Sequence, residues 1–289
     1  MNEPLFCGVC TAMVTPFDNG AVNYPMMQKL LERQIEAGIH AVVIAGTTGE
    51  SATLSDDEKT ELFKKCKAFV GNDCLIIAGT GSNNTEHSIT LSLTAQEAGV
   101  DGLLVVSPYY NKATSEGIYL HYRAICDAVK LPVIIYNVPG RTGLDIPVPV
   151  YQKLSQCQNV AGIKEACTDI TKIAKIRNIC GTDLPVWSGN DDQIVPVMSL
   201  GGQGVVSVLS NILPRQTKEI CDAAQNGDYK TAAQLQCKYM DLIEFLFCEV
   251  NPIPVKSMMR VIGYDCGDCR LPLCNLTKEN TLKMNSLLK

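Results

Sequence analysis

The chain has 289 residues and a formal net charge of −5 at pH 7, with 46% hydrophobic and 19% charged residues. This composition is typical of a globular protein with a large buried core. The sequence holds no long basic run and no apolar stretch of membrane-spanning length, which argues against nucleic-acid and membrane partners. Its first residues, MNEPLFCGVC, lack a basic and hydrophobic signal region, so we expect a cytoplasmic protein.

Short apolar runs alternate with amphipathic segments about eight times along the chain. Several runs are continuous in Val, Ile and Leu, as in parallel strands that are covered on both faces. Between the runs, apolar residues recur at helical spacing, and Ser55 followed by Glu58 indicates a capping box at a helix start. We predict strands over residues 8–15, 41–45, 75–78, 102–107, 132–136, 161–164, 185–188 and 204–208.

Eight uninterrupted β–α repeats favour a closed (β/α)8 barrel, or TIM barrel, over an open doubly wound sheet. No GxGxxG follows the first predicted strand, which argues against a dinucleotide site of the Rossmann type. From about Pro214 onward the sequence is mainly helical, and the segment NPIPVK (251–256) interrupts this region before a further helix. We therefore predict an α/β fold in which residues 1–225 form the barrel and residues 226–289 form a C-terminal helical extension packed on it.

Fourteen cysteines are scattered over the chain. In a cytosolic protein of this size they are expected to be reduced thiols that behave as small apolar residues. Two CxxC pairs, Cys7 with Cys10 and Cys266 with Cys269, leave a metal or disulfide role open. The two pairs lie far apart in the sequence, and a strand would send positions 7 and 10 to opposite faces, so joint ligation is disfavoured.

Lys164, in the stretch NVAGIKEA (159–166), stands at the end of a predicted strand. An isolated ammonium is costly to bury, so this lysine must pair or lose its charge. A neutral amine can form a Schiff base with a carbonyl substrate. In barrel enzymes the active site lies at the carboxyl ends of the strands. The polar residues predicted at the other strand ends are Thr47 and Thr48, Tyr109 and Tyr110, Tyr136 and Arg141, and Ser188, Gly189 and Asn190.

The three histidines lie away from these strand ends. His40 precedes a strand, and His87 and His121 fall in predicted helices. An enzyme built on a histidine metal cluster is therefore disfavoured, and we predict neither a metal nor a cofactor. Covalent amine catalysis with tyrosine as the proton carrier fits the available residues better.

Each candidate residue also has an ordinary structural explanation. Lys164 could be salt-bridged to Glu165, tyrosine hydroxyls commonly find water, and Arg141 could be an ordinary loop arginine. Gly46 and Gly49 could be turn glycines, although small residues after a strand also let N–H groups and hydroxyls approach an anion at a helix start. The placement of all these residues at successive strand ends favours an active site.

The motifs VTPF, GTTGES, PYYNK, YNVPGRTG, GIKEA, SGNDD, GVVSV and NPIPVK occur in this order along the chain. In this combination the sequence resembles the dihydrodipicolinate synthase / N-acetylneuraminate lyase family over essentially its whole length. The resemblance implies a (β/α)8 barrel and a pyruvate-dependent Schiff-base (class I) aldolase without a cofactor. It also implies a homodimer or a homotetramer built as a dimer of dimers.

The resemblance implies a role for each matching residue. Lys164 matches the lysine that attacks the pyruvate ketone, and Thr47 and Thr48 match the groups that hold the pyruvate carboxylate. Tyr136 matches the general acid and base. Together with Thr47 and Tyr110 it would form a proton relay, in which Tyr110 is inserted from the neighbouring subunit. A positioned chain of hydroxyls can move protons without bulk water entering the site.

Arg141, Gly189 and Val206 are expected to bind substrate. In the synthases of the family an arginine at position 141 receives the carboxylate of aspartate β-semialdehyde, for which a guanidinium offers a bidentate fork. The implied reaction is the condensation of pyruvate with this semialdehyde, the first committed step of the diaminopimelate and lysine pathway. The alternatives are a sialic-acid or sugar-acid lyase of the same family, and a catalytically silent barrel that acts as a binding protein. A phosphate-binding isomerase is disfavoured, because no basic residue joins the glycine-rich turns after strands seven and eight.

Lysine-inhibited members of the family carry a regulatory site at positions that match Asp56, Lys59, Asn83, His87 and Tyr109. Feedback-sensitive enzymes typically place histidine at position 59 and an acidic residue at position 87. A cation at 59 and the loss of the acid at 87 disfavour a cationic ligand. We therefore expect weak or absent inhibition by lysine.

Overall fold

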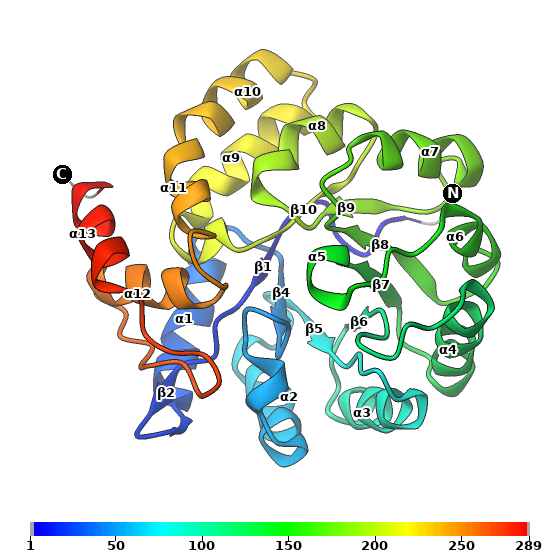
Figure 1. The fold of residues 1–289 in the computed structure, drawn as a ribbon, viewed down its shortest axis with the longest axis horizontal. Coiled ribbons are helices and arrows are strands. Elements are labelled where there is room, and N and C mark those ends of the chain that lie inside the picture. The colour runs from blue at the N-terminus through cyan, green and yellow to red at the C-terminus, as the bar shows by residue number, and fades with distance from the viewer. Residues whose placement is uncertain (1–2, 288–289) are drawn as a thin grey trace.

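The structure, a computed structural model, describes residues 3–287. Eight parallel strands close into a barrel in the order β1-β10-β9-β8-β7-β6-β5-β4, so the predicted (β/α)8 barrel is confirmed (Figure 1). The ends of the predicted strands shift by up to three residues. The barrel strands are β1 (Gly8–Ala12), β4 (Ala41–Ile44), β5 (Leu75–Gly79), β6 (Gly102–Val106), β7 (Val133–Asn137), β8 (Val160–Glu165), β9 (Val186–Ser188) and β10 (Gly204–Ser207).

Helices surround the strands in Figure 1 and cover their outer face. They are α1 (Tyr24–Glu36), α2 (Asp56–Val70), α3 (Thr85–Glu97), α4 (Ser115–Ala128), α6 (Val148–Leu154), α7 (Thr171–Cys180), α8 (Ile194–Ser199) and α9 (Pro214–Gln225). The short helix α5 (Pro139–Thr142) lies inside this ring, near the centre of Figure 1, and the 3-10 helices are η1 (Ser51–Thr53), η2 (Asp191–Gln193) and η3 (Leu209–Asn211). The predicted capping box at α2 is confirmed. The Ser55 side chain accepts from the Glu58 N–H, and the Glu58 carboxylate accepts from the Ser55 N–H.

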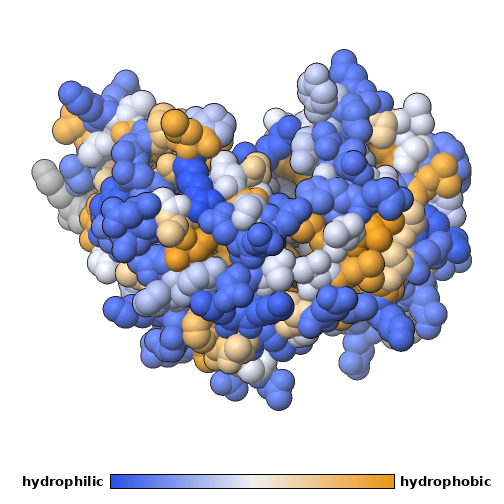
Figure 2. Space-filling model, turned by 90° about the horizontal axis from the view of Figure 1, so that it is seen from below, coloured by the Kyte–Doolittle hydropathy of each residue, from blue (hydrophilic) through white to orange (hydrophobic). Residues whose placement is uncertain are grey.

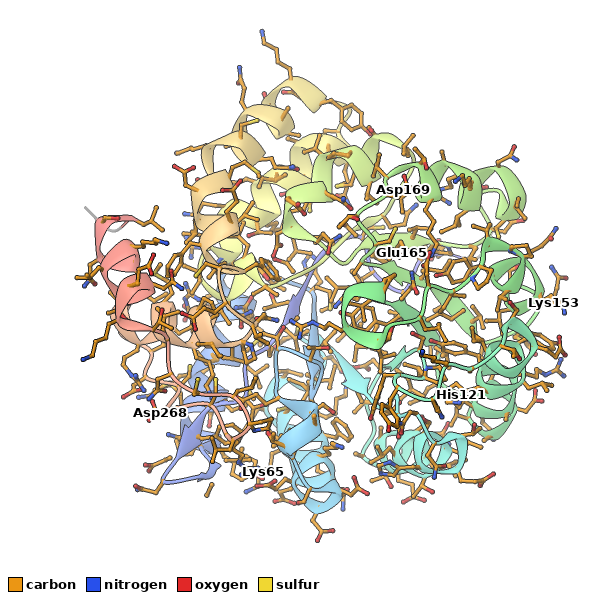
Figure 3. All side chains as sticks on the ribbon, in the orientation of Figure 1. Lys65, His121, Lys153, Glu165, Asp169 and Asp268 are labelled. Carbon is orange, nitrogen blue, oxygen red and sulfur yellow. The ribbon has the colours of Figure 1, made fainter. Side chains whose placement is uncertain are left out.

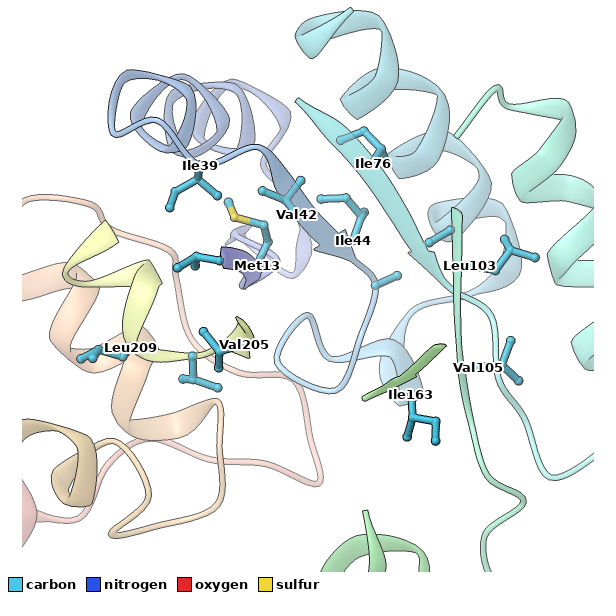
Figure 4. Packing of buried hydrophobic residues seen from close by; sticks show 14 of the residues in the cluster. Met13, Ile39, Val42, Ile44, Ile76, Leu103, Val105, Ile163, Val205 and Leu209 are labelled. Carbon is cyan, nitrogen blue, oxygen red and sulfur yellow. The ribbon is translucent and has the colours of Figure 1, made fainter. Parts of the chain in front are cut away.

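The barrel strands bury both faces, in two separate apolar clusters. Val42 and Ile44 of β4 pack outward against the helices (Figure 4). Val43 between them belongs to the cluster that fills the barrel. The same alternation holds on β8, β9 and β10, where Ile163, Val186 and Val205 face outward. Continuous Val/Ile/Leu runs arise because neither face of these strands meets water.

The chain beyond α9 forms α10 (Tyr229–Lys238), α11 (Met240–Phe245), α12 (Ile253–Val261) and α13 (Lys278–Leu287), which lie together along one side of the barrel (Figure 1). We propose residue 226 as the start of this extension. The sequence did not predict the small antiparallel sheet of β2 (Phe17–Asp18) and β3 (Ala21–Val22). These strands are only two residues long and carry no clear alternation.

Arg270 ties the extension back to the barrel. Its guanidinium donates to the Glu58 carboxylate at 2.8 Å and to the Thr53 carbonyl at 2.8 Å, and it lies 4.3 Å from the ring centre of Phe17. These hydrogen bonds hold the pKa of Glu58 at about 2, with Arg270 as the main cause. One arginine therefore contacts α2, the segment after the GTTGES loop, and the β2–β3 sheet.

All fourteen cysteines are free thiols. Cys7 is exposed just before β1, whereas Cys10 is buried within it. Burial raises the pKa of most of these thiols, for example that of Cys66 and Cys266 to about 12. Within residues 3–287, no helix is both long and apolar enough to cross a bilayer.

Candidate active site

Lys164 and Tyr136 lie side by side inside the barrel. They are register partners on the neighbouring strands β8 and β7, and only 5% and 6% of their surfaces are exposed. The Lys164 Nζ atom lies 4.1 Å from the centre of the Tyr136 ring. No acidic residue between positions 3 and 287 forms an ion pair with Lys164, so a structural salt bridge to Glu165 does not explain it. Lys164 is therefore a buried amine held against a phenol.

Glu165 points outward toward α6 and α7, because successive residues of a strand face opposite sides. Its carboxylate accepts from Asn137 at 2.6 Å and from the Tyr151 hydroxyl at 3.0 Å, and it pairs with the Lys172 ammonium at 3.4 Å. Burial and the Glu165 charge raise the pKa of Tyr151, which keeps it a hydrogen-bond donor. This outward network joins the carboxyl ends of β7 and β8, and so fixes the strands that present Tyr136 and Lys164.

The GTTGES loop follows β4. Thr47 is partly buried, and Thr48 is 2% exposed and accepts a hydrogen bond from Asn251. Glu50 is buried in an ion pair with Lys256 at 2.8 Å and has a left-handed φ of 56°. The GTTG residues do not open α2 directly, because a turn and η1 intervene before α2 begins at Asp56. The loop is instead held in place by side chains from the C-terminal extension.

A cavity of about 560 Å³ opens beside the GTTGES loop and Tyr136. Thr47, Tyr136 and Arg141 all line it, together with apolar side chains from β6 and the extension. Arg141 lies on α5, and its Nη2 atom donates to the Asn251 carbonyl at 3.3 Å. Seen from the side, the molecular surface is hollowed between two shoulders and is otherwise largely hydrophilic (Figure 2). The cavity thus brings a tyrosine, a threonine and a guanidinium to one space.

Gly189 and Val206 occupy the neighbouring strand ends. The Gly189 N–H donates to the Glu165 carbonyl at 2.7 Å, and a Cβ at this position would lie 2.6 Å from the Ala166 Cβ, so only glycine fits. Val206 is 1% exposed in the barrel interior, in register with Cys10. Neither residue has a polar side chain, so each affects the space at the strand ends and donates no side-chain hydrogen bond.

Tyr110 is not brought to the cavity of its own chain. It is 89% exposed and has a left-handed φ of 74°, which is strained for a tyrosine. Tyr109 beside it is 39% exposed and does line the cavity. The strained backbone holds an apolar ring outward, and such a ring is better suited to contact another protein surface than to remain in water.

The histidines lie where the sequence predicted them. His40 is exposed before β4, His87 is on α3 and His121 is on α4. Burial lowers the pKa of His121 to about 4, so it is a neutral core residue. Across the described part of the chain, residues 3–287, no group of three or more His, Cys, Asp or Glu side chains could hold a metal ion.

The positions expected for a regulatory site surround Asp56. Its carboxylate lies 2.9 Å from His87 Nε2 and 3.6 Å from Lys59 Nζ. Burial opposes ionisation of this carboxyl, but the hydrogen bond and charge of His87 and the charge of Lys59 together lower its pKa. Asn83 accepts from Asn111 through its backbone carbonyl, and Tyr109 lines the cavity. The Asp56 carboxylate at this site is thus already paired with the side chains of His87 and Lys59.

A TIM barrel that holds a buried lysine, without an ion-pair partner in residues 3–287, against a tyrosine at its strand ends has the arrangement of a Schiff-base enzyme. The chain belongs to the Dihydrodipicolinate synthetase family, whose model matches residues 5–289. It is 46% identical to a 4-hydroxy-tetrahydrodipicolinate synthase of Clostridium perfringens, over 99% of this chain and 100% of the relative.

Solved structures agree with this membership. The crystal structure of dihydrodipicolinate synthase from Aquifex aeolicus superposes with a TM-score of 0.96 at 39% identity, covering 98% of this chain and 97% of the other. A monomeric dihydrodipicolinate synthase variant superposes equally well, with a TM-score of 0.96 at 38% identity, over 98% of this chain and 96% of the variant.

Proposed function

We propose that this chain condenses pyruvate with aspartate β-semialdehyde to give 4-hydroxy-tetrahydrodipicolinate, the first committed step of the diaminopimelate and lysine pathway. The observation that carries the proposal is the buried Lys164 amine, which has no ion-pair partner among residues 3–287 and lies 4.1 Å from the Tyr136 ring centre. Family membership over residues 5–289 and relatives that carry the name of this synthase support it.

In the proposed reaction the neutral Lys164 amine attacks the ketone carbon of pyruvate, and loss of water gives a protonated imine. The imine draws electrons from the adjacent methyl group, which loses a proton to give an enamine. The enamine carbon then attacks the aldehyde carbon of the semialdehyde, and the new alkoxide takes up a proton. Finally the amino group of the semialdehyde attacks the imine carbon and displaces Lys164, which closes the ring and frees the enzyme.

We assign the proton transfers to Tyr136, because it is the titratable side chain that both contacts Lys164 and lines the cavity. Thr47 reaches the same cavity and would pass protons between Tyr136 and Tyr110 of a neighbouring copy. The outward exposure of Tyr110 suits this role in a homodimer or homotetramer. We also propose a cytoplasmic location.

A substrate comparison tests the proposed function against its alternatives. The wild-type protein is expected to consume pyruvate only when aspartate β-semialdehyde is present, and to leave N-acetylneuraminate and 2-keto-3-deoxy sugar acids uncleaved. Cleavage of a sugar acid with no condensation would identify a lyase. Neither activity on folded protein would leave a binding protein as the better interpretation.

Arg141 is expected to select the semialdehyde. Its guanidinium lines the cavity and offers two N–H donors to a carboxylate. Arg141→Ala should raise the KM for the semialdehyde about 10- to 100-fold, because a hydrogen bond to a charged group contributes about 1.5–3 kcal/mol. Imine formation with pyruvate should stay nearly intact, and steady-state kinetics combined with borohydride trapping would measure both.

A matched control for this prediction is Arg123→Ala, which removes an exposed arginine paired with Asp127 on α4, outside the cavity. This variant should keep the wild-type KM for both substrates. Unchanged semialdehyde kinetics in Arg141→Ala would exclude the proposed role.

Free lysine is expected to inhibit this enzyme weakly or not at all. The Asp56 carboxylate is engaged by His87 and Lys59, and Lys59 presents a buried cation where a lysine ligand would have to lie. Turnover measured with about 1 mM L-lysine should match turnover without it. The variant Lys59→His/His87→Glu should gain inhibition, and clear inhibition of the wild type at or below this concentration would contradict the prediction.

A further inference from the structure

Asn251 lies between the two residues that are proposed to hold the substrate carboxylates. Its Nδ2 atom donates to Thr48 Oγ1 at 2.9 Å, and its backbone carbonyl accepts from Arg141 Nη2 at 3.3 Å. The side chain is 4% exposed and borders the cavity. It is 203 residues from Thr48 in the sequence, so the contact exists only in the folded barrel.

The hydrogen bond from Asn251 determines what the Thr48 hydroxyl can do. A hydroxyl has one proton to donate and two lone pairs that accept. Thr48 Oγ1 accepts from Asn251, and no acceptor within residues 3–287 takes its proton. The proton therefore has no acceptor within the described residues, and a carboxylate bound beside Thr48 would supply one.

The second polar atom of the Asn251 amide is its oxygen, Oδ1. Asn251 Oδ1 is buried and forms no hydrogen bond within the described residues 3–287. A buried polar atom without a partner is costly and in native proteins usually serves a role. The side chain must also be neutral at this place, because an acid here would repel both substrate carboxylates.

The segment that carries Asn251 is fixed from its other end. Five residues further on, Lys256 pairs with Glu50 of the GTTGES loop at 2.8 Å, with both side chains almost completely buried. The segment 251–256 therefore contacts this loop twice. Asn251 donates to Thr48 at the edge of the cavity, and Lys256 forms the buried ion pair with Glu50. The position of the Asn251 amide relative to Thr48 is set by this double attachment.

We propose that Asn251 is a positioning residue that orients the Thr48 hydroxyl toward the pyruvate carboxylate, while its backbone carbonyl holds Arg141 for the second substrate. This inference rests on the proposed function. The Asn251 side chain would affect pyruvate binding through Thr48, and its backbone carbonyl would affect semialdehyde binding through Arg141. Side-chain variants of Asn251 should therefore affect the two substrates unequally.

The test measures borohydride trapping of pyruvate and the two KM values in Asn251→Ala, Thr48→Val and the double variant. Asn251→Ala should raise the pyruvate concentration for half-maximal trapping about tenfold, with a much smaller change in semialdehyde KM than Arg141→Ala causes. In the Thr48→Val background the same substitution should have little further effect, because its partner hydroxyl is gone. Asn251→Asp, of nearly the same size, should weaken pyruvate binding more than alanine does.

Thr48→Ser keeps the hydroxyl and serves as the matched control, in which the response to Asn251→Ala should persist. Additive effects in the double variant, or wild-type pyruvate trapping in Asn251→Asp, would overturn the inference. If Asn251→Ala unfolds at a lower temperature than the wild type, Asn251→Asp provides the test at constant volume. Failure of the wild type to trap pyruvate would instead overturn the proposed function, so the two failures are distinguishable.

Discussion

Lys164→Ala is expected to lose all covalent trapping of pyruvate by borohydride and to lower kcat/KM by about 10⁴-fold or more. The amine is the group that bonds to the substrate in the proposed reaction, so its removal deletes the pathway rather than weakening one step. Intact-mass measurement after reduction with and without pyruvate gives a yes-or-no result. Lys164→Arg should behave in the same way, because a guanidinium keeps the charge but does not form an imine.

The matched control is Lys153→Ala, which removes an exposed lysine paired with Glu116 at the outside of the barrel (Figure 3). It should keep the pyruvate adduct and the wild-type activity. Three other buried lysines, Lys59, Lys172 and Lys256, hold ion pairs and should carry no adduct in peptide maps. An adduct that survives in folded Lys164→Ala would place the chemistry on another amine and refute the assignment.

The barrel was predictable from the sequence because strands that are buried on both faces carry apolar residues at nearly every position. Runs such as AVVI and LIIAG carry apolar residues at every position, and only strands covered on both sides require this. Alternation then predicts that two neighbours on one strand face opposite ways. The stretch IKE accordingly sends Lys164 into the barrel and Ile163 and Glu165 out of it.

The residues that hold the site in place were not predictable in the same way. Glu50 and Lys256 are 206 residues apart, and Thr48 and Asn251 are 203 apart, so neither pairing follows from local periodicity. The motif NPIPVK was visible in the sequence, but its role depends on where the extension returns to the barrel. Tyr110 shows a related limit, because it is 89% exposed in a single chain and its proposed role depends on a second copy.

Lys256→Met is expected to lower the free energy of unfolding by about 3–5 kcal/mol, the usual cost of leaving one partner of a buried ion pair uncompensated. The Glu50 side chain is 0% exposed, and after the substitution its carboxylate would keep the backbone N–H of Arg270 at 2.9 Å and the Cys269 thiol as donors but no cation in an ion pair. Urea unfolding followed by circular dichroism would measure the loss. Activity should fall as well, because Glu50 belongs to the loop that carries Thr47 and Thr48.

The double variant Glu50→Gln/Lys256→Met separates the ion pair from the packing of its side chains. Removing both charges leaves no buried ion without a partner, so part of the lost stability should return. Lys283→Met, which breaks an exposed pair with Glu279, should leave the unfolding midpoint nearly unchanged. If Lys256→Met is as stable as the wild type, the ion pair with Lys256 does not hold the GTTGES loop, and its attachment to the extension must come from the Asn251–Thr48 and Arg270–Glu50 hydrogen bonds.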